Sequence, residues 1–197
     1  MSTEFDKSQT KVNLARAFAG ECQDGARYQF IATQAEQEGY AYIKSMLKTL
    51  AKNEMAHAKV FYDLITQNCT KKQDNIAIEG GYPFTFGNLQ QNLMDSINTE
   101  ISQSNNVYPA FSKIARDEGF EDIAHAFDLV STVENCHHLL LKQVYDKMKG
   151  KKLYKSATPQ KWKCSNCGFE HTAKQAWSEC PSCHMGQGYV EIPIETE

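Results

Sequence analysis

Four cysteines near the C-terminal end place the strongest constraint on how this chain can fold. They form two C-x2-C pairs, Cys164/Cys167 and Cys180/Cys183, with twelve residues between the pairs. Each pair can direct two thiolates at one ion, and two pairs complete a tetrahedral sulfur site. The segment from Trp162 onward is too short to be stabilised by a hydrophobic core alone, so it needs a cross-link such as this metal site. The sequence therefore predicts a small C-terminal domain organised by a metal ion.

The identity of that metal is left open by the cysteine spacing, because zinc ribbons and rubredoxin-type iron sites share this geometry. Gly168 follows Cys167 and can adopt a positive φ, which lets backbone amides turn toward sulfur. Such amides stabilise an added electron and tune a reduction potential. This feature favours a redox iron, with a structural zinc ion as the alternative.

The remaining bulk properties exclude several classes of protein. Seven cysteines are present in 197 residues, and the first ten, MSTEFDKSQT, lack the layout of a secretory signal. An odd number of cysteines without an export signal favours metal binding in a reducing compartment over a disulfide framework. The net charge is -3 and the pI is near 6.1, which suggests no nucleic-acid or anionic-membrane partner. We therefore expect a cytoplasmic protein that binds neither nucleic acid nor membranes.

Most of the chain shows the apolar periodicity of long helices. The connection at 69–86 contains GGYPF and is longer than most loops, which indicates that it crosses the length of a bundle. Pro109 should kink the third helix, because proline lacks a backbone donor and its ring crowds the preceding turn. The predicted helices span residues 8–38, 41–67, 87–119 and 121–149.

The composition changes after the fourth helix, where the run MKGKKLYKSATPQK is rich in lysine and poor in apolar residues. We interpret this run as the candidate linker between two domains. The predicted organisation is an all-α four-helix bundle at 1–149, a linker at 150–160 and the tetracysteine domain at 161–197.

Two E-x-x-H motifs lie in the middle of the second and fourth predicted helices. They are Glu54/His57 and Glu134/His137. Residues three apart project from the same face of a helix, so each pair can converge on one ion. A single E-x-x-H on an exposed helix is usually a solvated pair. Two such motifs, with one glutamate from each of the other helices, match the ligand set of carboxylate-bridged two-iron bundles. Glu21 and Glu100 are the candidates on those helices.

Taken together, the motifs of this chain resemble those of rubrerythrins, in the same order. The motifs are AFAGECQ with the following Arg27 and Tyr28, then EMAHAK, GYPF, VYPAFSKIARDEGFEDIA, VENCH, WKCSNCGFEH and CPSC. The resemblance implies a ferritin-like bundle followed by a β-rich, rubredoxin-like domain. It also implies a peroxidase, a homodimer or higher homo-oligomer, that reduces hydrogen peroxide to water in oxidative-stress protection. Electrons would come from rubredoxin or an NAD(P)H-dependent reductase, through the rubredoxin-like iron.

The resemblance also implies roles for individual residues. Tyr28 and Tyr108 match tyrosines that hydrogen-bond near the irons. Cys164, Cys167, Cys180 and Cys183 would hold one iron. The ligands of the two-iron site would be Glu21, Glu54, His57, Glu100, Glu134 and His137.

Gln103 departs from the family pattern, which usually has a second glutamate three residues after the position of Glu100. In the resemblance, that glutamate ligates one iron in the oxidised state, and the iron moves to the histidine at position 57 on reduction. A glutamine offers an amide oxygen but no charge. Two ferrous ions are already balanced by four glutamates. Our hypothesis is that His57 remains a ligand in both states and that the iron moves little.

Several alternatives remain at this point. A solvent ligand can fill the place at position 103 without altering the chemistry, or the site can hold another divalent metal or fewer than two ions. A ferritin-like iron-oxidising or iron-handling protein would use the same bundle. A redox-silent protein with zinc in the cysteine domain would use the same ligands.

Overall fold

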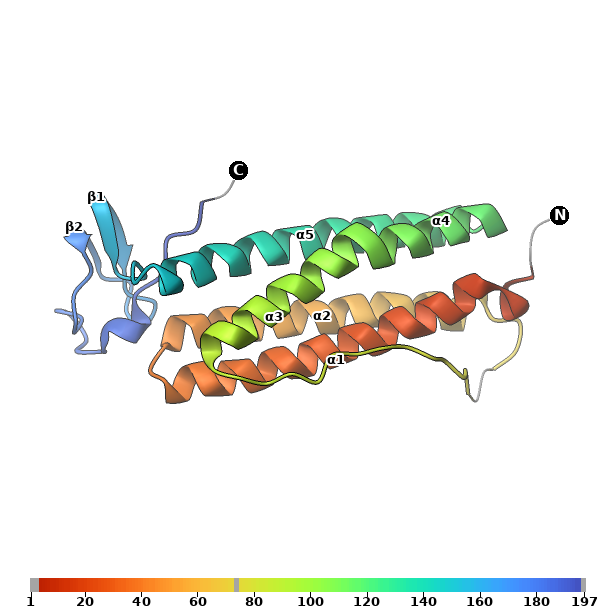
Figure 1. The fold of residues 1–197 in the computed structure, drawn as a ribbon, viewed down its shortest axis with the longest axis horizontal. Coiled ribbons are helices and arrows are strands. Elements are labelled where there is room, and N and C mark those ends of the chain that lie inside the picture. Colours follow the sequence, from red (N-terminus) through yellow and green to blue (C-terminus); the bar gives the residue numbers. More distant parts are fainter. Residues whose placement is uncertain (1–3, 73–74, 196–197) are drawn as a thin grey trace.

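Four long helical stretches run side by side in the computed structural model, which describes residues 4–72 and 75–195 (Figure 1). This arrangement confirms the predicted bundle, and the predicted ends agree with the observed ones to within two residues. A short 3-10 turn, Phe5–Lys7, precedes the first helix. The helices are α1 (Gln9–Gln37), α2 (Ala41–Asn68), α3 (Leu89–Ser102), α4 (Tyr108–Glu118) and α5 (Glu121–Lys149).

The helix ends follow from local chemistry. The Ser8 side chain accepts a hydrogen bond from the Lys11 amide and caps α1. Asn88 and Gln91 form a reciprocal capping box at the start of α3. Gly119 ends α4 with a φ of 91°, a left-handed conformation that glycine adopts without a Cβ penalty.

The predicted kink at Pro109 takes the form of a π-helical segment, Gln103–Val107, immediately before α4. Here the Tyr108 amide donates to the carbonyl of Gln103, five residues back. Proline has no amide to donate and crowds the carbonyl four residues earlier, so the wider turn accommodates Pro109 without ending the helical stretch. Such π turns occur frequently at functional sites.

The connection between α2 and α3 runs along α1 for much of the bundle, as expected for a crossover (Figure 1). Side chains of α1 hold it by its backbone. Arg16 donates to the carbonyl of Glu79 over 2.8 Å, and Gln23 donates to the carbonyl of Pro83 over 2.8 Å. In return, the Tyr82 hydroxyl donates to the carbonyl of Arg16 over 3.2 Å.

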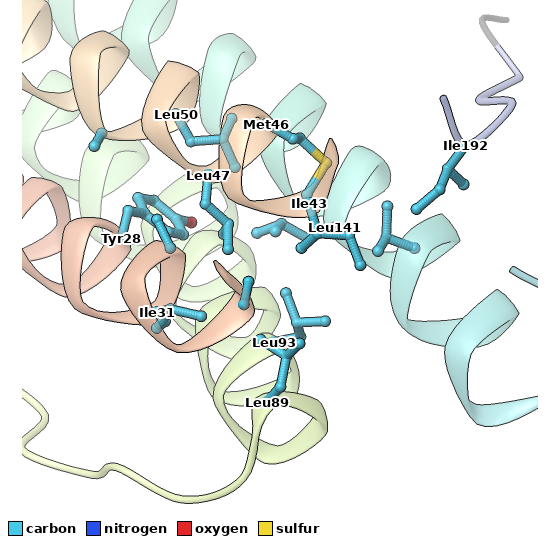
Figure 2. Packing of buried hydrophobic residues seen from close by; sticks show 14 of the residues in the cluster. Tyr28, Ile31, Ile43, Met46, Leu47, Leu50, Leu89, Leu93, Leu141 and Ile192 are labelled. Carbon is cyan, nitrogen blue, oxygen red and sulfur yellow. The ribbon is translucent and has the colours of Figure 1, made fainter. Parts of the chain in front are cut away.

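Two hydrophobic clusters fill the bundle, one toward each end. Figure 2 shows part of the first, in which Leu47, Leu93 and Leu141 from three helices pack together. The second contains Phe61 and Phe127, whose ring centroids lie 5.2 Å apart. Each fully buried aliphatic or aromatic side chain contributes about 1.5–3 kcal/mol to stability. Between the clusters, the helices carry buried glutamates instead of apolar residues.

The small C-terminal domain pairs β1 (Lys155–Lys163) antiparallel with β2 (Glu170–Gln175). Trp162 is fully buried against Ala176 and Val190 and forms its core. β1 begins inside the segment predicted as a linker, because Lys155 already pairs with Gln175. In the described part of the chain, no helix is long and apolar enough to cross a membrane.

The small domain docks on one end of the bundle (Figure 1). Gln143 of α5 exchanges two hydrogen bonds with the backbone of Glu195, over 3.0 Å and 2.8 Å. Gly188 lies against the turn between α1 and α2. A Cβ added to Gly188 would lie 1.7 Å from the carbonyl oxygen of Gly39.

The variant Gly188→Ala should loosen this docking, because the added methyl group cannot fit without displacing the turn. We expect faster tryptic cleavage within residues 150–160, measured by mass spectrometry. Gly186→Ala is the matched control, because a Cβ there meets nothing within 4 Å. Equal cleavage rates for both variants would contradict this account of the docking.

Candidate metal centre

Four glutamates, one from each of four helices, meet in the middle of the bundle. Each is only 1% exposed. The helix of origin is α1 for Glu21, α2 for Glu54, α3 for Glu100 and α5 for Glu134. The structure therefore brings together all four glutamates that the sequence analysis selected.

The two histidines divide these glutamates into two overlapping groups. The ligand atoms within each group all lie within 4.8 Å of one another. Glu54 and Glu134 belong to both groups. The groups are Glu21, Glu54, His57 and Glu134, and Glu54, Glu100, Glu134 and His137. This is the arrangement that two neighbouring ions require when they share two carboxylates.

The histidine Nδ1 atoms face the carboxylates. His57 Nδ1 lies 3.0 Å from Glu134 Oε1 and 3.4 Å from Glu21 Oε2. His137 Nδ1 lies 2.9 Å from Glu134 Oε2 and 3.1 Å from Glu54 Oε1. Each histidine therefore contacts a glutamate that the two groups share.

The donor set fits metal ions. One oxygen of each glutamate is buried without a hydrogen bond from the described residues: Glu21 Oε2, Glu54 Oε1, Glu100 Oε2 and Glu134 Oε1. Histidine nitrogens lie close to these oxygens but are not aligned to donate. A buried carboxylate oxygen without a partner is costly, and a cation removes that cost. Glutamate and imidazole ligands together suit divalent iron, manganese or zinc.

The pKa values of these glutamates and histidines reflect the same cost of burying charge. Burial, together with the neighbouring carboxylates, raises the pKa of Glu21 to about 8. Burial alone would lower the pKa of His57, but its contacts with Glu134, Glu21 and Glu54 raise it to about 12. These groups hold protons where bound metal ions would supply positive charge instead.

Two buried tyrosines hold the outer edge of the glutamate layer. The Tyr28 hydroxyl donates to Glu100, and the Tyr108 hydroxyl donates to Glu21. Burial raises the pKa of both phenols well above its usual value, so both remain donors. Each tyrosine donates to a glutamate that belongs to one group only.

The four cysteines form the second candidate metal site. Their sulfur atoms lie within 4.8 Å of one another, with Cys164 and Cys183 3.7 Å apart and Cys167 and Cys180 3.7 Å apart. The backbone amide of Met185 and the side chain of Asn166 donate to Cys183 and lower the pKa of its thiol to about 6. Gly168 has the predicted positive φ, 77°. Burial raises the pKa of the Cys164 thiol to about 11, so the donors favour the thiolate at Cys183, and a bound metal ion would favour it at Cys164.

Comparisons with known proteins agree with both sites. The rubrerythrin family matches residues 12–145 and 91–164, and its rubredoxin-like domain matches residues 162–191. Rubrerythrin-1 of Clostridium acetobutylicum is 35% identical, over 95% of this chain and 96% of that protein. Rubrerythrin of Porphyromonas gingivalis is 31% identical, over 100% of this chain and 95% of that protein. This chain belongs to the rubrerythrin family.

A solved structure of nigerythrin in a partially reduced state shares the fold. It is 24% identical, with a TM-score of 0.63, and the match covers 96% of this chain and 92% of that chain. The fold class, a ferritin-like bundle with a rubredoxin-like domain, is therefore confirmed, and both sets of candidate ligands for rubrerythrin iron are present.

Gln103, the departure from the rubrerythrin pattern, is turned toward α1. Its amide nitrogen donates to Asp24 Oδ2 over 2.9 Å. Asp24 is 6% exposed, and its other oxygen lies 3.2 Å from Arg27. Burial raises the pKa of Asp24 to about 6, against the opposing effects of Arg27 and Gln103. Asp24 was not among the predicted site residues, although its position three residues after Glu21 indicates that it shares a helix face with a candidate ligand.

A cavity of about 510 Å³ lies on the outer side of these residues. Its walls come from α1, the connection at 80–85 and the stretch from α3 to α4. Asp24, Gln103 and Tyr108 line its inner wall, next to the glutamate layer. The cavity is therefore a space from which a small molecule can approach the candidate metal centre.

The shared position of Glu54 predicts unequal effects of removing glutamates. Glu54→Ala should lose both ions of the bundle, whereas Glu21→Ala should retain one, because Glu54, Glu100, Glu134 and His137 remain complete. Iron per chain, measured by plasma mass spectrometry, tests this, with Glu38→Ala as an exposed control. Equal iron loss in Glu54→Ala and Glu21→Ala would contradict the shared geometry.

Proposed function

We propose that this chain is a peroxidase that reduces hydrogen peroxide to water at a two-iron site in the bundle. The observation that best supports this proposal is the pair of overlapping ligand groups that share Glu54 and Glu134. A family relationship with rubrerythrins and a separate tetracysteine site support the proposal. The reaction consumes one peroxide, two protons and two electrons and yields two waters. When bound, two ferrous ions would supply the two electrons and the Lewis acidity for O–O cleavage.

The first contribution of the protein is the negative charge of its glutamates. Four glutamates supply four negative charges, which balance two divalent ions. Tyr28 and Tyr108 hold the glutamates that belong to one group only, so the ligands remain oriented when the charge of the site changes. The helices shield the layer from bulk water, which strengthens each of these interactions.

The tetracysteine domain is proposed to return electrons one at a time, with rubredoxin or an NAD(P)H-dependent reductase as the donor. The domain contacts the bundle at the turn before α2. His57 lies sixteen residues into that helix from Ala41, a rise of about 24 Å. The small domain and the metal centre of the same chain are thus far apart along the bundle. This separation supports the proposal of a homodimer, in which the domain of one chain passes electrons to the partner's bundle.

The hydrogen bond between Gln103 and Asp24 bears on the redox cycle. Gln103 brings no charge, and its amide nitrogen donates to Asp24, which turns the side chain toward α1. We therefore propose that His57 remains a ligand in both oxidation states. Crystals in the oxidised and dithionite-reduced states test this point.

Peroxidase activity is tested by anaerobic turnover of hydrogen peroxide with reduced rubredoxin. We expect turnover by the wild-type protein and its loss in Cys183→Ser, which breaks the electron supply. In Cys183→Ser, the chemically reduced bundle should still be oxidised in a single turnover by peroxide. A colourless wild-type protein with stoichiometric zinc and no turnover would contradict the proposal and favour the redox-silent alternative.

A further inference from the structure

Three of the hydrogen bonds that join α1 to the antiparallel stretch from α3 to α4 lie at successive levels along the two helices. Each lies beside the candidate metal centre. From one level to the next, the donors and acceptors are Tyr28 to Glu100, Gln103 to Asp24, and Tyr108 to Glu21. We call these bonds the three rungs. The middle rung is the only one of the three that involves neither a tyrosine nor a candidate ligand.

Two of the three rungs, those of Gln103 and Tyr108, lie between the cavity and the glutamate layer. Asp24, Gln103 and Tyr108 line the cavity on its inner side. The carboxylates behind them are each 1% exposed. A molecule in the cavity therefore meets the middle rung before it meets the candidate ligands.

The middle rung is also the rung that can open. The tyrosines of the outer rungs are 2% and 1% exposed, and aromatic or aliphatic neighbours pack around them. Gln103 is only half-buried and stands at the start of the π-helical segment. Asp24 is anchored by Arg27, which also donates to Thr99 over 3.3 Å. Opening would therefore move the Gln103 side chain and leave Asp24 in place.

We propose that the hydrogen bond between Gln103 and Asp24 is the gate through which a peroxide passes from the cavity to the metal centre. The inference rests on the proposed function for the identity of this ligand. Gln103 and Asp24 act here as positioning residues that control access.

The chemistry of the gate suits a small neutral hydroperoxide. Hydrogen peroxide can donate to the Asp24 carboxylate and accept from the Gln103 amide, so it replaces the bond that it breaks. A small anion can accept from Gln103, but the Asp24 carboxylate repels it. The gate should therefore slow anions more than neutral peroxides.

A second route is available on the other side of the site, where the His57 side chain is 12% exposed. If ligands enter there, the middle rung is a structural contact between two helices, and its removal leaves the rate of ligand entry unchanged. The two routes therefore predict different kinetics.

Azide binding to the oxidised, iron-loaded protein tests the gate without peroxide turnover. Stopped-flow absorbance of the azide-to-iron charge-transfer band gives the association rate. Gln103→Ala removes the movable side chain and should raise this rate roughly tenfold or more, a factor equal to about 1.4 kcal/mol. That value lies near the lower end of the range for a hydrogen bond to a charged group.

Asp24→Asn retains the shape and removes the charge, so it should raise the azide rate more than the rate of oxidation by peroxide. Asn106→Ala, on the exposed side of the same π-helical segment, is the matched control and should behave as wild type. Iron content is measured for each variant, and rates are compared per loaded site.

Wild-type azide rates in both Gln103→Ala and Asp24→Asn would overturn the gate. The proposed function can fail separately. Accelerated azide binding in a protein that does not turn over peroxide would retain the gate and refute only the peroxidase.

Discussion

The mutual repulsion of four buried carboxylates is the constraint on which the rest of this structure depends. Glu21, Glu54, Glu100 and Glu134 come from four different helices and are almost completely removed from water. Without cations, such a layer costs several kcal/mol per uncompensated charge. Two divalent ions would balance the four charges and would link the helices through shared ligands. We therefore interpret the bundle as a scaffold in which metal binding and folding are coupled.

The surroundings of this layer follow from the same constraint. Apolar clusters on both sides supply the stability that a charged layer does not. Tyr28 and Tyr108 donate to one oxygen each of Glu100 and Glu21, and Gln103 donates to Asp24. The π-helical segment lies opposite this part of α1, where Pro109 interrupts the regular backbone hydrogen bonding. The side of the bundle that carries these polar contacts is also the side on which the cavity lies.

Much of the architecture was predictable because it depends on local spacing. The E-x-x-H motifs gave both histidines and two glutamates, since residues three apart must share a helix face. The paired C-x2-C motifs located the second metal site for a similar reason. The helix bounds followed from the apolar periodicity, because residues that recur at helical spacing share one buried face.

The features that the sequence did not predict depend on contacts between distant segments. The spacing of Asp24 from Glu21 indicates a shared helix face, but its partner Gln103 lies 79 residues away and is known only from the fold. The docking of Gly188 on Gly39 and the cavity beside the connection are likewise products of tertiary packing. The kink at Pro109 was expected, but its π-helical form was not, because a proline can be accommodated by an ordinary kink as well as by a wider turn.

The most direct test of the central claim is a pair of crystal structures, oxidised and dithionite-reduced, with iron located by anomalous scattering. We predict two iron positions that share Glu54 and Glu134, with His57 bound in both states and Gln103 still paired with Asp24. A single ion, two ions that share neither glutamate, or an iron that leaves His57 for Gln103 on oxidation would contradict this account.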